Sequence, residues 1–314
     1  FYEGHQLIRR YDPQGRPTGY ALQNAASSVL ATKNYTYDPS GHLSTVSDSS
    51  DTFTYEYAPD SNLLASITAP HHSVSYTYEA NRDRMILIDN QISGASISKY
   101  TYTYDELGRR SNRMQSGSAI NRTSTDTFSY NNRSEVIGST NNVETTTKWN
   151  PTYSYDAIGN RTSSAGIFEA NYTSNKLNQY SAITAPSAVN NPTYDLDGNL
   201  TDDGDNRTYT WNNENRLQTA GDGKKTLSFT YDYQGRLVKK DDNKYIEIYL
   251  YDGWNRIATC TFKNEKLKVH KAYLWGLDLS GTLQGAGGVG GLLKESGHNS
   301  NYKLTKAYFC LYDA

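Results

Sequence analysis

The chain has 314 residues, and 36% of them are apolar when its 28 tyrosines are included. Its 31 basic and 33 acidic side chains nearly balance, so the chain lacks the net charge that keeps a polar polymer disordered. The pI of about 6.3 and the mixing of lysines with acidic residues argue against nucleic acid as a partner. The apolar runs are far too short to span a membrane, and two cysteines cannot build a disulfide scaffold.

One sequence unit recurs from Tyr11 to Tyr251. Each copy begins with an aromatic residue, in most copies followed by Asp or Asn, and successive copies are about 22 residues apart, which is the length of one β-hairpin with its connection. The complete unit reads Tyr-Asp-x-x-Gly, then Arg or Asn, then Leu, as at 231–237. This period predicts stacked hairpins, each of which relies on its neighbours to bury its apolar face. The aromatic positions are Tyr11, Tyr37, Tyr57, Tyr78, Tyr104, Tyr130, Tyr155, Tyr172, Tyr194, Trp211, Tyr231 and Tyr251.

The spacing of Asp and Gly within the unit is typical of a type I turn followed by a residue in the left-handed conformation. The Asp carboxylate accepts hydrogen bonds from backbone N–H groups a few residues on, and Gly tolerates the positive φ. Where Gly is absent we expect Asn215 and Asn255 to hold this position, whereas Arg82 and Ser134 predict altered or longer turns. The predicted turn residues are Asp12, Gly15, Asp38, Gly41, Asp105, Gly108, Asp156, Gly159, Asp195, Gly198, Asp232, Gly235, Asp252 and Asn255.

Aromatic residues two positions apart precede most turns, from Tyr35 and Tyr37 to Tyr249 and Tyr251. Residues at this spacing lie on one face of a strand, and the Thr, Ser, Glu or Leu between them lies on the other. After each turn an apolar residue such as Leu237 begins the return strand. The pattern predicts antiparallel strands with an aromatic ladder on one face and a mostly polar face opposite.

The C-terminal part of the chain differs in composition. We assign a repeat region to residues 1–314, with a glycine-rich segment at 273–297 within it. Residues 291–296 are expected to form a turn that Gly297 ends, and no segment predicts a helix. The predicted fold class is all-β, with antiparallel β-hairpin repeats that form a curved or spiral sheet.

Three stretches carry the most specific form of the repeat: 176–180, 194–201 and 209–217. On these residues the chain resembles the Rhs or YD-repeat proteins, which include bacterial polymorphic toxins, the C component of insecticidal Tc toxins and the animal teneurins. The segments 273–278 and 281–292 are similar to a region near the C-terminal end of such arrays. The resemblance covers almost the whole chain. It implies a sheet of hairpins that spirals into a hollow shell around a C-terminal toxic or signalling polypeptide.

The resemblance implies no catalytic residue in this chain. In the family, a core region carries an aspartate-dependent self-cleaving element around an Asp-Pro-x-x-Gly-Leu-like motif. Here Asp12-Pro13 and Asp38-Pro39 belong to ordinary repeat turns, and no later Asp-Pro occurs. Both termini interrupt repeat units and no signal peptide opens the chain, so we expect a fragment of a longer bacterial protein that is secreted or displayed at the cell surface.

Other patterns favour structural interpretations. The Gly-x-Gly-x-x-Gly pattern at 285–290 lacks the following helix of a nucleotide site, which favours a flexible loop. The adjacent His71 and His72 would point to opposite sides of a strand, so a surface loop is preferred to a metal site. Cys260 and Cys310 are expected to be small buried hydrophobic residues. We therefore predict no catalytic, cofactor-binding or metal-binding residues.

Three hypotheses for function remain. The preferred one is a non-catalytic module of the wall of an Rhs-type shell, whose partner is the enclosed C-terminal polypeptide of the parent protein. The second is a carbohydrate-binding or adhesion module that stacks exposed Tyr and Trp rings on surface glycans. The third, an enzyme with a site near 285–291, ranks last, and a deep pocket there with converging carboxylate, His and backbone N–H groups would favour it.

Overall fold

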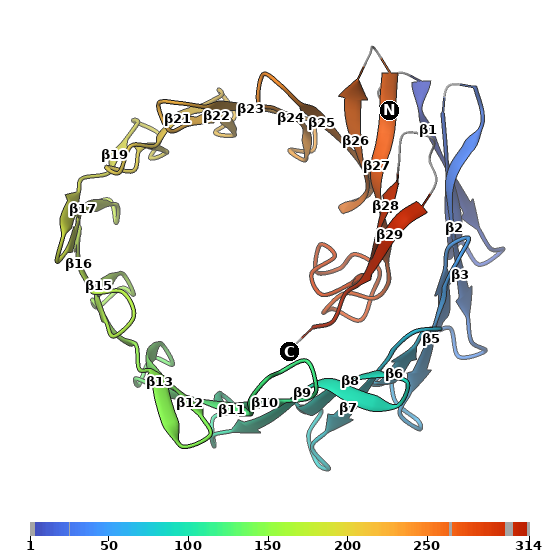
Figure 1. Ribbon diagram of the computed structural model, residues 1–314, viewed down its shortest axis with the longest axis horizontal. Coiled ribbons are helices and arrows are strands. Elements are labelled where there is room, and N and C mark those ends of the chain that lie inside the picture. Colours follow the sequence, from blue (N-terminus) through green and yellow to red (C-terminus); the bar gives the residue numbers. More distant parts are fainter. Residues whose placement is uncertain (1–3, 25, 264–265, 299–303, 313–314) are drawn as a thin grey trace. The chain divides into compact units, whose positions relative to one another are not determined.

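The computed structural model describes residues 4–24, 26–263, 266–298 and 304–312. Regular secondary structure within these ranges consists of β-strands, which confirms the predicted all-β class (Figure 1). These ranges hold no helix long and apolar enough to cross a membrane. The chain divides into two compact units, of which the first combines Phe1–Ser75 with Ser228–Ala314 and the second is Tyr76–Leu227.

The first unit contains the earliest and the latest strands of the chain. Strands β7 and β23 each cross its boundary with the second unit. Its strands are β1 (Gln6–Tyr11), β2 (Pro17–Gln23), β3 (Val29–Tyr37), β4 (Leu43–Ser47), β5 (Thr52–Tyr57), β6 (Leu64–Thr68), β7 (Ser73–Tyr78), β23 (Thr226–Tyr231), β24 (Leu237–Asp241), β25 (Ile246–Asp252), β26 (Asn255–Lys263), β27 (Lys266–Trp275), β28 (Leu292–His298) and β29 (Leu304–Phe309).

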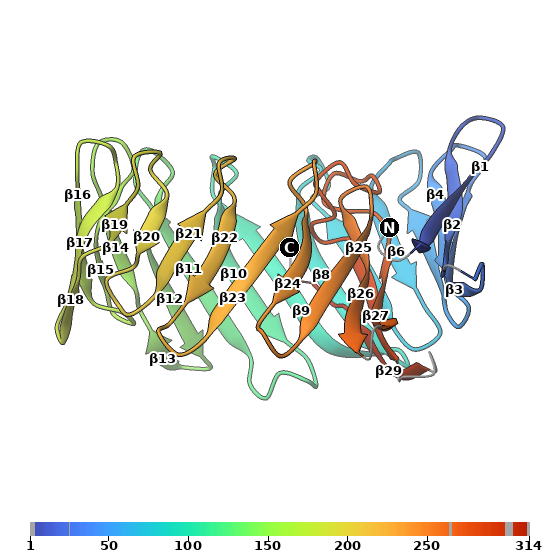
Figure 2. The ribbon, with the colours of Figure 1, turned by 90° about the horizontal axis from the view of Figure 1, so that it is seen from above.

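The second unit contains the middle of the chain. Figure 2 shows its hairpins side by side. Its strands are β8 (Met85–Ile92), β9 (Ala95–Tyr104), β10 (Arg110–Ser116), β11 (Ser124–Tyr130), β12 (Val136–Val143), β13 (Thr146–Trp149), β14 (Thr152–Tyr155), β15 (Arg161–Ala165), β16 (Ala170–Ser174), β17 (Tyr180–Ala185), β18 (Ala188–Asn190), β19 (Thr193–Tyr194), β20 (Leu200–Asp202), β21 (Thr208–Trp211) and β22 (Leu217–Gly221).

Most strands pair antiparallel with the next one along the chain, as in β3 with β4 and β14 with β15, whereas β18 and β19 belong to different sheets. In the repeat hairpins the register shifts immediately before the aromatic residue. Thr36 faces Thr45 but Tyr37 faces Leu43, so one residue of β4 is left over. Such a bulge joins a short turn to twisted strands without splaying them.

In the first unit two layers of sheet pack face to face. Tyr20 and Leu22 of β2 belong to the same buried cluster as Ile248 and Leu250 of β25. Figure 1 shows β26 and β27 beside β1–β3 in this unit. The interface is a hydrophobic core whose other buried members are Ile257, Ala258, Cys260, Val269 and Ala272.

This core depends on a local change in the repeat. In β21 the residues that alternate with the aromatics Tyr209 and Trp211 are Thr208 and Thr210, both exposed. In β25 the corresponding residues are the buried Ile248 and Leu250. An apolar residue in place of Thr converts the polar face of the strand into one that must be covered, because exposed aliphatic area is unfavourable in water. Ile248 and Leu250 thus specify where the layers overlap.

The structure corrects the prediction for residues 291–296. From Leu292 onward they belong to strand β28, which pairs with β27 on one side and with β29 on the other. Alternate residues Leu293 and Glu295 lie on one face and Lys294 and Ser296 on the other, a period-two pattern that the neighbouring glycines obscured in the sequence.

The overlap core predicts a large effect of Leu250→Ala, because Leu250 is 2% exposed. The substitution should lower the free energy of unfolding by about 2–5 kcal/mol, the range for a buried leucine. Urea denaturation followed by circular dichroism measures it. Leu196→Ala is the control, since Leu196 lies fully exposed at a turn. Equal midpoints for the two variants would contradict the core.

Candidate functional site

The Asp of each repeat organises its turn. The carboxylate Oδ1 of Asp156 accepts hydrogen bonds from the backbone N–H groups of Ile158 at 3.0 Å and Asn160 at 2.9 Å. The backbone of Asp156 also donates to the carbonyl of Asn160 and accepts from Gly159, whose φ is 92°. A short carboxylate and a residue tolerant of positive φ therefore close the turn together.

The same arrangement recurs in both units. Backbone and carboxylate bonds of this kind lie at Asp12, Asp38, Asp105, Asp195 and Asp232, with positive φ at Gly15, Gly41, Gly108, Gly198 and Gly235.

One predicted turn is built differently. Asp252 and Asn255 face each other directly across a two-residue turn, and Gly253 has the positive φ of 57°. The expectation that Asn255 would hold the left-handed position was wrong, because Gly253 at the first turn position allows the shorter hairpin. Asn255 is instead buried, and its amide donates to the carbonyl of Leu283 at 3.2 Å.

Three other turns test the expectations for repeats without Gly. Asn215 has a φ of 56°, as predicted. Ser134 takes the same conformation, with φ 63°, in a turn of ordinary length, so the expectation of an altered turn there was wrong. The turn from Glu79 to Arg84 is one residue longer, as expected at Arg82.

The residue after Gly links one turn to the next. Arg109 donates from Nε to the Asp105 carboxylate at 2.6 Å, and its guanidinium lies 4.6 Å from the centre of the Tyr130 ring in the following hairpin. Asn199 serves a similar role, with its amide 3.0 Å from Asp195 and 2.9 Å from Asn215 of the next turn. Its hydrogen bond is the main cause that lowers the pKa of Asp195.

The tip of the repeat aromatic binds the preceding hairpin. The Tyr130 hydroxyl donates to the carbonyl of Arg110 at 2.7 Å. In other repeats the donor is an indole N–H, as in Trp211 to Leu200 at 2.7 Å. Further pairs of this kind are Tyr37 to Pro17, Tyr57 to Leu43, Tyr104 to Met85, Tyr155 to Val136, Tyr194 to Tyr180, Tyr251 to Leu237, Trp275 to Arg256 and Tyr312 to Leu292.

Sequence reasoning treated these aromatics as packing groups and missed the hydrogen bond. A signal was present, because the repeat position holds Tyr or Trp and never Phe, whereas Phe128 and Phe229 occupy the position two residues earlier. Only Tyr and Trp carry a donor at the tip of the ring.

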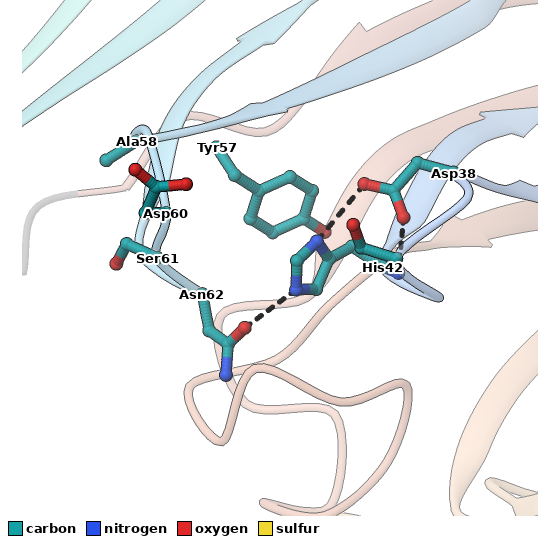
Figure 3. A pocket seen from close by; sticks show the side chains of 8 residues that line it. Asp38, His42, Tyr57, Ala58, Asp60, Ser61 and Asn62 are labelled. Carbon is teal, nitrogen blue, oxygen red and sulfur yellow. Dashed lines mark hydrogen bonds and ion pairs between the residues drawn. The ribbon is translucent and has the colours of Figure 1, made fainter.

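A shallow pocket of about 540 Å³ contains an Asp–His pair (Figure 3). His42 Nδ1 lies 3.1 Å from Asp38 and Nε2 lies 2.7 Å from the Asn62 amide oxygen. The bonds to Asn62 and Asp38 raise the pKa of His42, and its ring lies 4.6 Å from the Tyr57 ring. Both ring nitrogens are engaged, so His42 has no free nitrogen to act as a base. It occupies the position that Arg109 holds in its repeat.

The glycine-rich segment 273–297 is organised by its own carboxylate. Asp278 Oδ2 accepts from the N–H groups of Ala286 at 2.7 Å and Gly288 at 3.1 Å. The Gln284 amide bridges the carbonyl of Asp252 and the N–H of Trp254, both at 2.8 Å. The N–H groups that a phosphate would need are thus occupied, and the segment is an ordered loop rather than the flexible one expected.

The cysteines and the metal-ligating residue types form no reactive site among the described residues. Burial raises the pKa of the Cys260 thiol to about 12, as suits a packing residue rather than a nucleophile. Cys310 is half-buried, and both cysteines are free. The part of the chain described here contains no group of three or more His, Cys, Asp or Glu placed to hold a metal ion.

No family model matches the chain. Two curated proteins are similar in sequence. The tRNA3(Ser)-specific nuclease WapA of Bacillus spizizenii is 26% identical over 254 residues, which are 78% of this chain and 10% of that protein. The tRNA nuclease WapA of Bacillus subtilis strain 168 is 26% identical over 231 residues, which are 71% of this chain and 9% of that protein. The chain thus matches about a tenth of each relative's length.

Solved structures show the same fold. The crystal structure of TcdB2-TccC3-Cdc42 matches with a TM-score of 0.57 and 14% identity, over 95% of this chain and 17% of that one. The fold is that of the Rhs or YD-repeat shell. The crystal structure of TcdB2-TccC3 matches with a TM-score of 0.54 and 13% identity, again over 95% of this chain and 17% of that one.

Tyr155→Phe tests the tip hydrogen bond, because it removes the donor to Val136 and keeps the ring. The unpaired carbonyl should cost about 1 kcal/mol of unfolding free energy. Urea melts measure this cost. Tyr233→Phe is the matched control, because Tyr233 is 88% exposed. The same midpoint in both variants would rule out a structural role for the bond.

The turn carboxylate predicts a contrast between two substitutions of Asp195. Asn keeps the acceptor oxygen, as Asn212 does in a natural repeat turn, so Asp195→Asn should retain most of the wild-type stability. Asp195→Ala removes the acceptor of the Asp197 and Asn199 N–H groups and should lower the urea midpoint. Equal loss in both variants would show that the carboxylate acts through its charge instead.

Proposed function

We propose that this chain is a non-catalytic structural repeat module, part of an Rhs-type β-shell that encloses a C-terminal toxin or effector segment of its parent protein. The shell-type fold of the TcdB2-TccC3 structures supports the structural part of this proposal. The names of the curated relatives, both tRNA nucleases, support a toxin as the enclosed segment. Each relative extends far beyond the matched tenth, which leaves room for a nuclease elsewhere in it.

The observation that carries the proposal is how the repeat uses its polar groups. The carboxylates of the turns bind backbone N–H groups, the arginines bind those carboxylates, and the aromatic tips bind carbonyls of neighbouring hairpins. These polar groups of the repeat are engaged in holding hairpins together. This distribution of hydrogen bonds best supports a structural role as part of the wall of a shell.

Glycan binding receives less support than the shell. Rings that face an arginine, such as Tyr37 below Arg16 at 4.4 Å and Tyr130 below Arg109, have one face covered and cannot stack fully on a sugar. Exposed rings such as Tyr233 and Trp254 remain open to solvent. A glycan array probed with wild-type protein and with Tyr233→Ala would detect such binding.

The proposed location follows from the relatives and not from the chain itself. Toxins of the Rhs and Tc type act outside the producing cell, so we propose that the parent protein is secreted or held at the cell surface. The partner proposed for the shell is the enclosed polypeptide, with surface glycans as the alternative partner, and we propose neither a nucleic-acid partner nor a membrane span for this module.

A protection experiment tests enclosure. In the parent protein, a reporter containing a protease site is placed after the repeat region, and the matched control carries the same reporter before it. The expected result is slow cleavage of the first reporter, rapid cleavage of the second, and equal rates after denaturation. Equal rates in the native proteins would contradict enclosure, while the absence of tRNA cleavage by this chain alone checks the non-catalytic assignment.

A further inference from the structure

The C-terminal hairpin β28–β29 is attached to early strands of the first unit by a buried cluster of charges. The Lys294 ammonium lies 2.7 Å from Asp48, 2.5 Å from Asp51 and 2.8 Å from the Ser50 hydroxyl. The Lys294 side chain is 1% exposed. Strand β28 therefore places a single cation onto the turn between β4 and β5.

A second lysine completes this cluster. Lys33 of β3 lies 3.3 Å from Asp48 and is 4% exposed, so two ammonium groups face two carboxylates away from water. Burial by itself would raise the pKa of Asp48, but the charges of Lys33 and Lys294 hold it well below its usual value. Asp48 therefore stays ionised in the weakly acidic range and remains paired with Lys33 and Lys294 there.

Two histidines lie at the same contact. His72, in the turn between β6 and β7, is 7% exposed, and its ring lies 4.9 Å from that of Phe309 on β29 and 5.7 Å from that of Phe53. His298 ends β28. The Nδ1 atoms of both rings are buried without a hydrogen-bond partner. We predicted a surface loop for His71 and His72. In the structure His71 is exposed, as predicted, but His72 is buried.

This contact accommodates the neutral rings of His72 and His298 but not their protonated forms. A protonated ring needs partners for two N–H groups, and neither buried Nδ1 atom has one. The charged groups that face the rings are Lys33 from β3, Asp48 and Asp51 from the β4–β5 turn, His71 from the β6–β7 turn and Lys294 from β28. The one nearby negative group for His72, Asp51, is already bound by Lys294.

We propose that β28–β29 is an acid-released latch, held on the β4–β5 and β6–β7 turns at neutral pH. When His72 and His298 become protonated, the hairpin detaches from these turns and its ladder with β27 opens. The latch adds a pH response that the shell function does not require. Its test needs only this chain, so its failure would leave the proposed enclosure untouched.

The direction of the pH dependence follows from the two pKa values. Burial, and then the charge of His71, lowers the pKa of His72 below 6.5. Burial, together with Lys33 and Lys294, lowers that of His298. The detached histidines bind protons more readily than the docked ones, so the latch keeps its full stability above about pH 6.5. It loses stability as the pH falls below that value.

Hydrogen exchange tests the latch. Backbone amides of 292–298 and 304–309 are compared at pH 7.5 and 5.0 with those of 136–143, all corrected for intrinsic exchange rates. Protection of the hairpin should fall by about tenfold for each unit by which the docked histidine pKa is depressed, while β12 should be unaffected. Unchanged protection of the hairpin at pH 5.0 would overturn the proposal.

Variants separate the histidines from general acid effects. His72→Phe with His298→Gln should keep the hairpin protected at pH 5.0, and His72→Phe alone should reduce the loss if the double variant does not fold. His270→Gln is the control, since His270 is exposed on β27. Loss of protection in the histidine variants equal to that of wild type would refute the mechanism.

Discussion

The structure depends on one type of hydrogen bond, which runs from the tip of the aromatic ring in a repeat to a backbone carbonyl of the preceding hairpin. Ladders between successive hairpins are short: β4 pairs with β5 only from Thr45 to Ser47. The carbonyl of Leu43 lies beyond that ladder, nearer the turn, and the Tyr57 hydroxyl reaches it at 2.9 Å. A buried carbonyl without a donor is unfavourable, so the ring extends the pairing where backbone bonds end. Consecutive hairpins are joined at the turn end as well as along their strands.

Residues of the preceding turn hold the aromatic ring that makes this bond. Asp105 fixes Arg109, and Arg109 covers the ring of Tyr130, whose hydroxyl binds the residue that follows Arg109. One motif thus builds its own turn and also holds the aromatic ring of the next motif. An exposed ion pair contributes little alone, but here the paired arginine also covers the aromatic ring of the next motif. The same position accepts His42 or Asn199 because each can bind the turn carboxylate and reach the next hairpin.

The repeat alone was sufficient to predict the hairpins, the strand faces and most turns, because local chemistry determines them. Asp and Gly spacing specifies a turn wherever it occurs, as at Asp156 and Gly159. What could not be predicted depends on residues distant in the chain. The burial of His72 requires Phe309, and the role of Lys294 requires Asp48 and Asp51. No spacing rule within one repeat connects such partners.

Three departures from the repeat coincide with tertiary contacts. Ile248 and Leu250 replace polar residues where a second layer of sheet covers β25. The two-residue turn at Gly253 occurs where Gln284 docks onto Asp252 and Trp254. At Gly276 a Cβ atom would overlap the Tyr55 hydroxyl, so only glycine allows this approach of the C-terminal segment to β5. At these three places, the residue that breaks the pattern marks a contact that the pattern itself cannot supply.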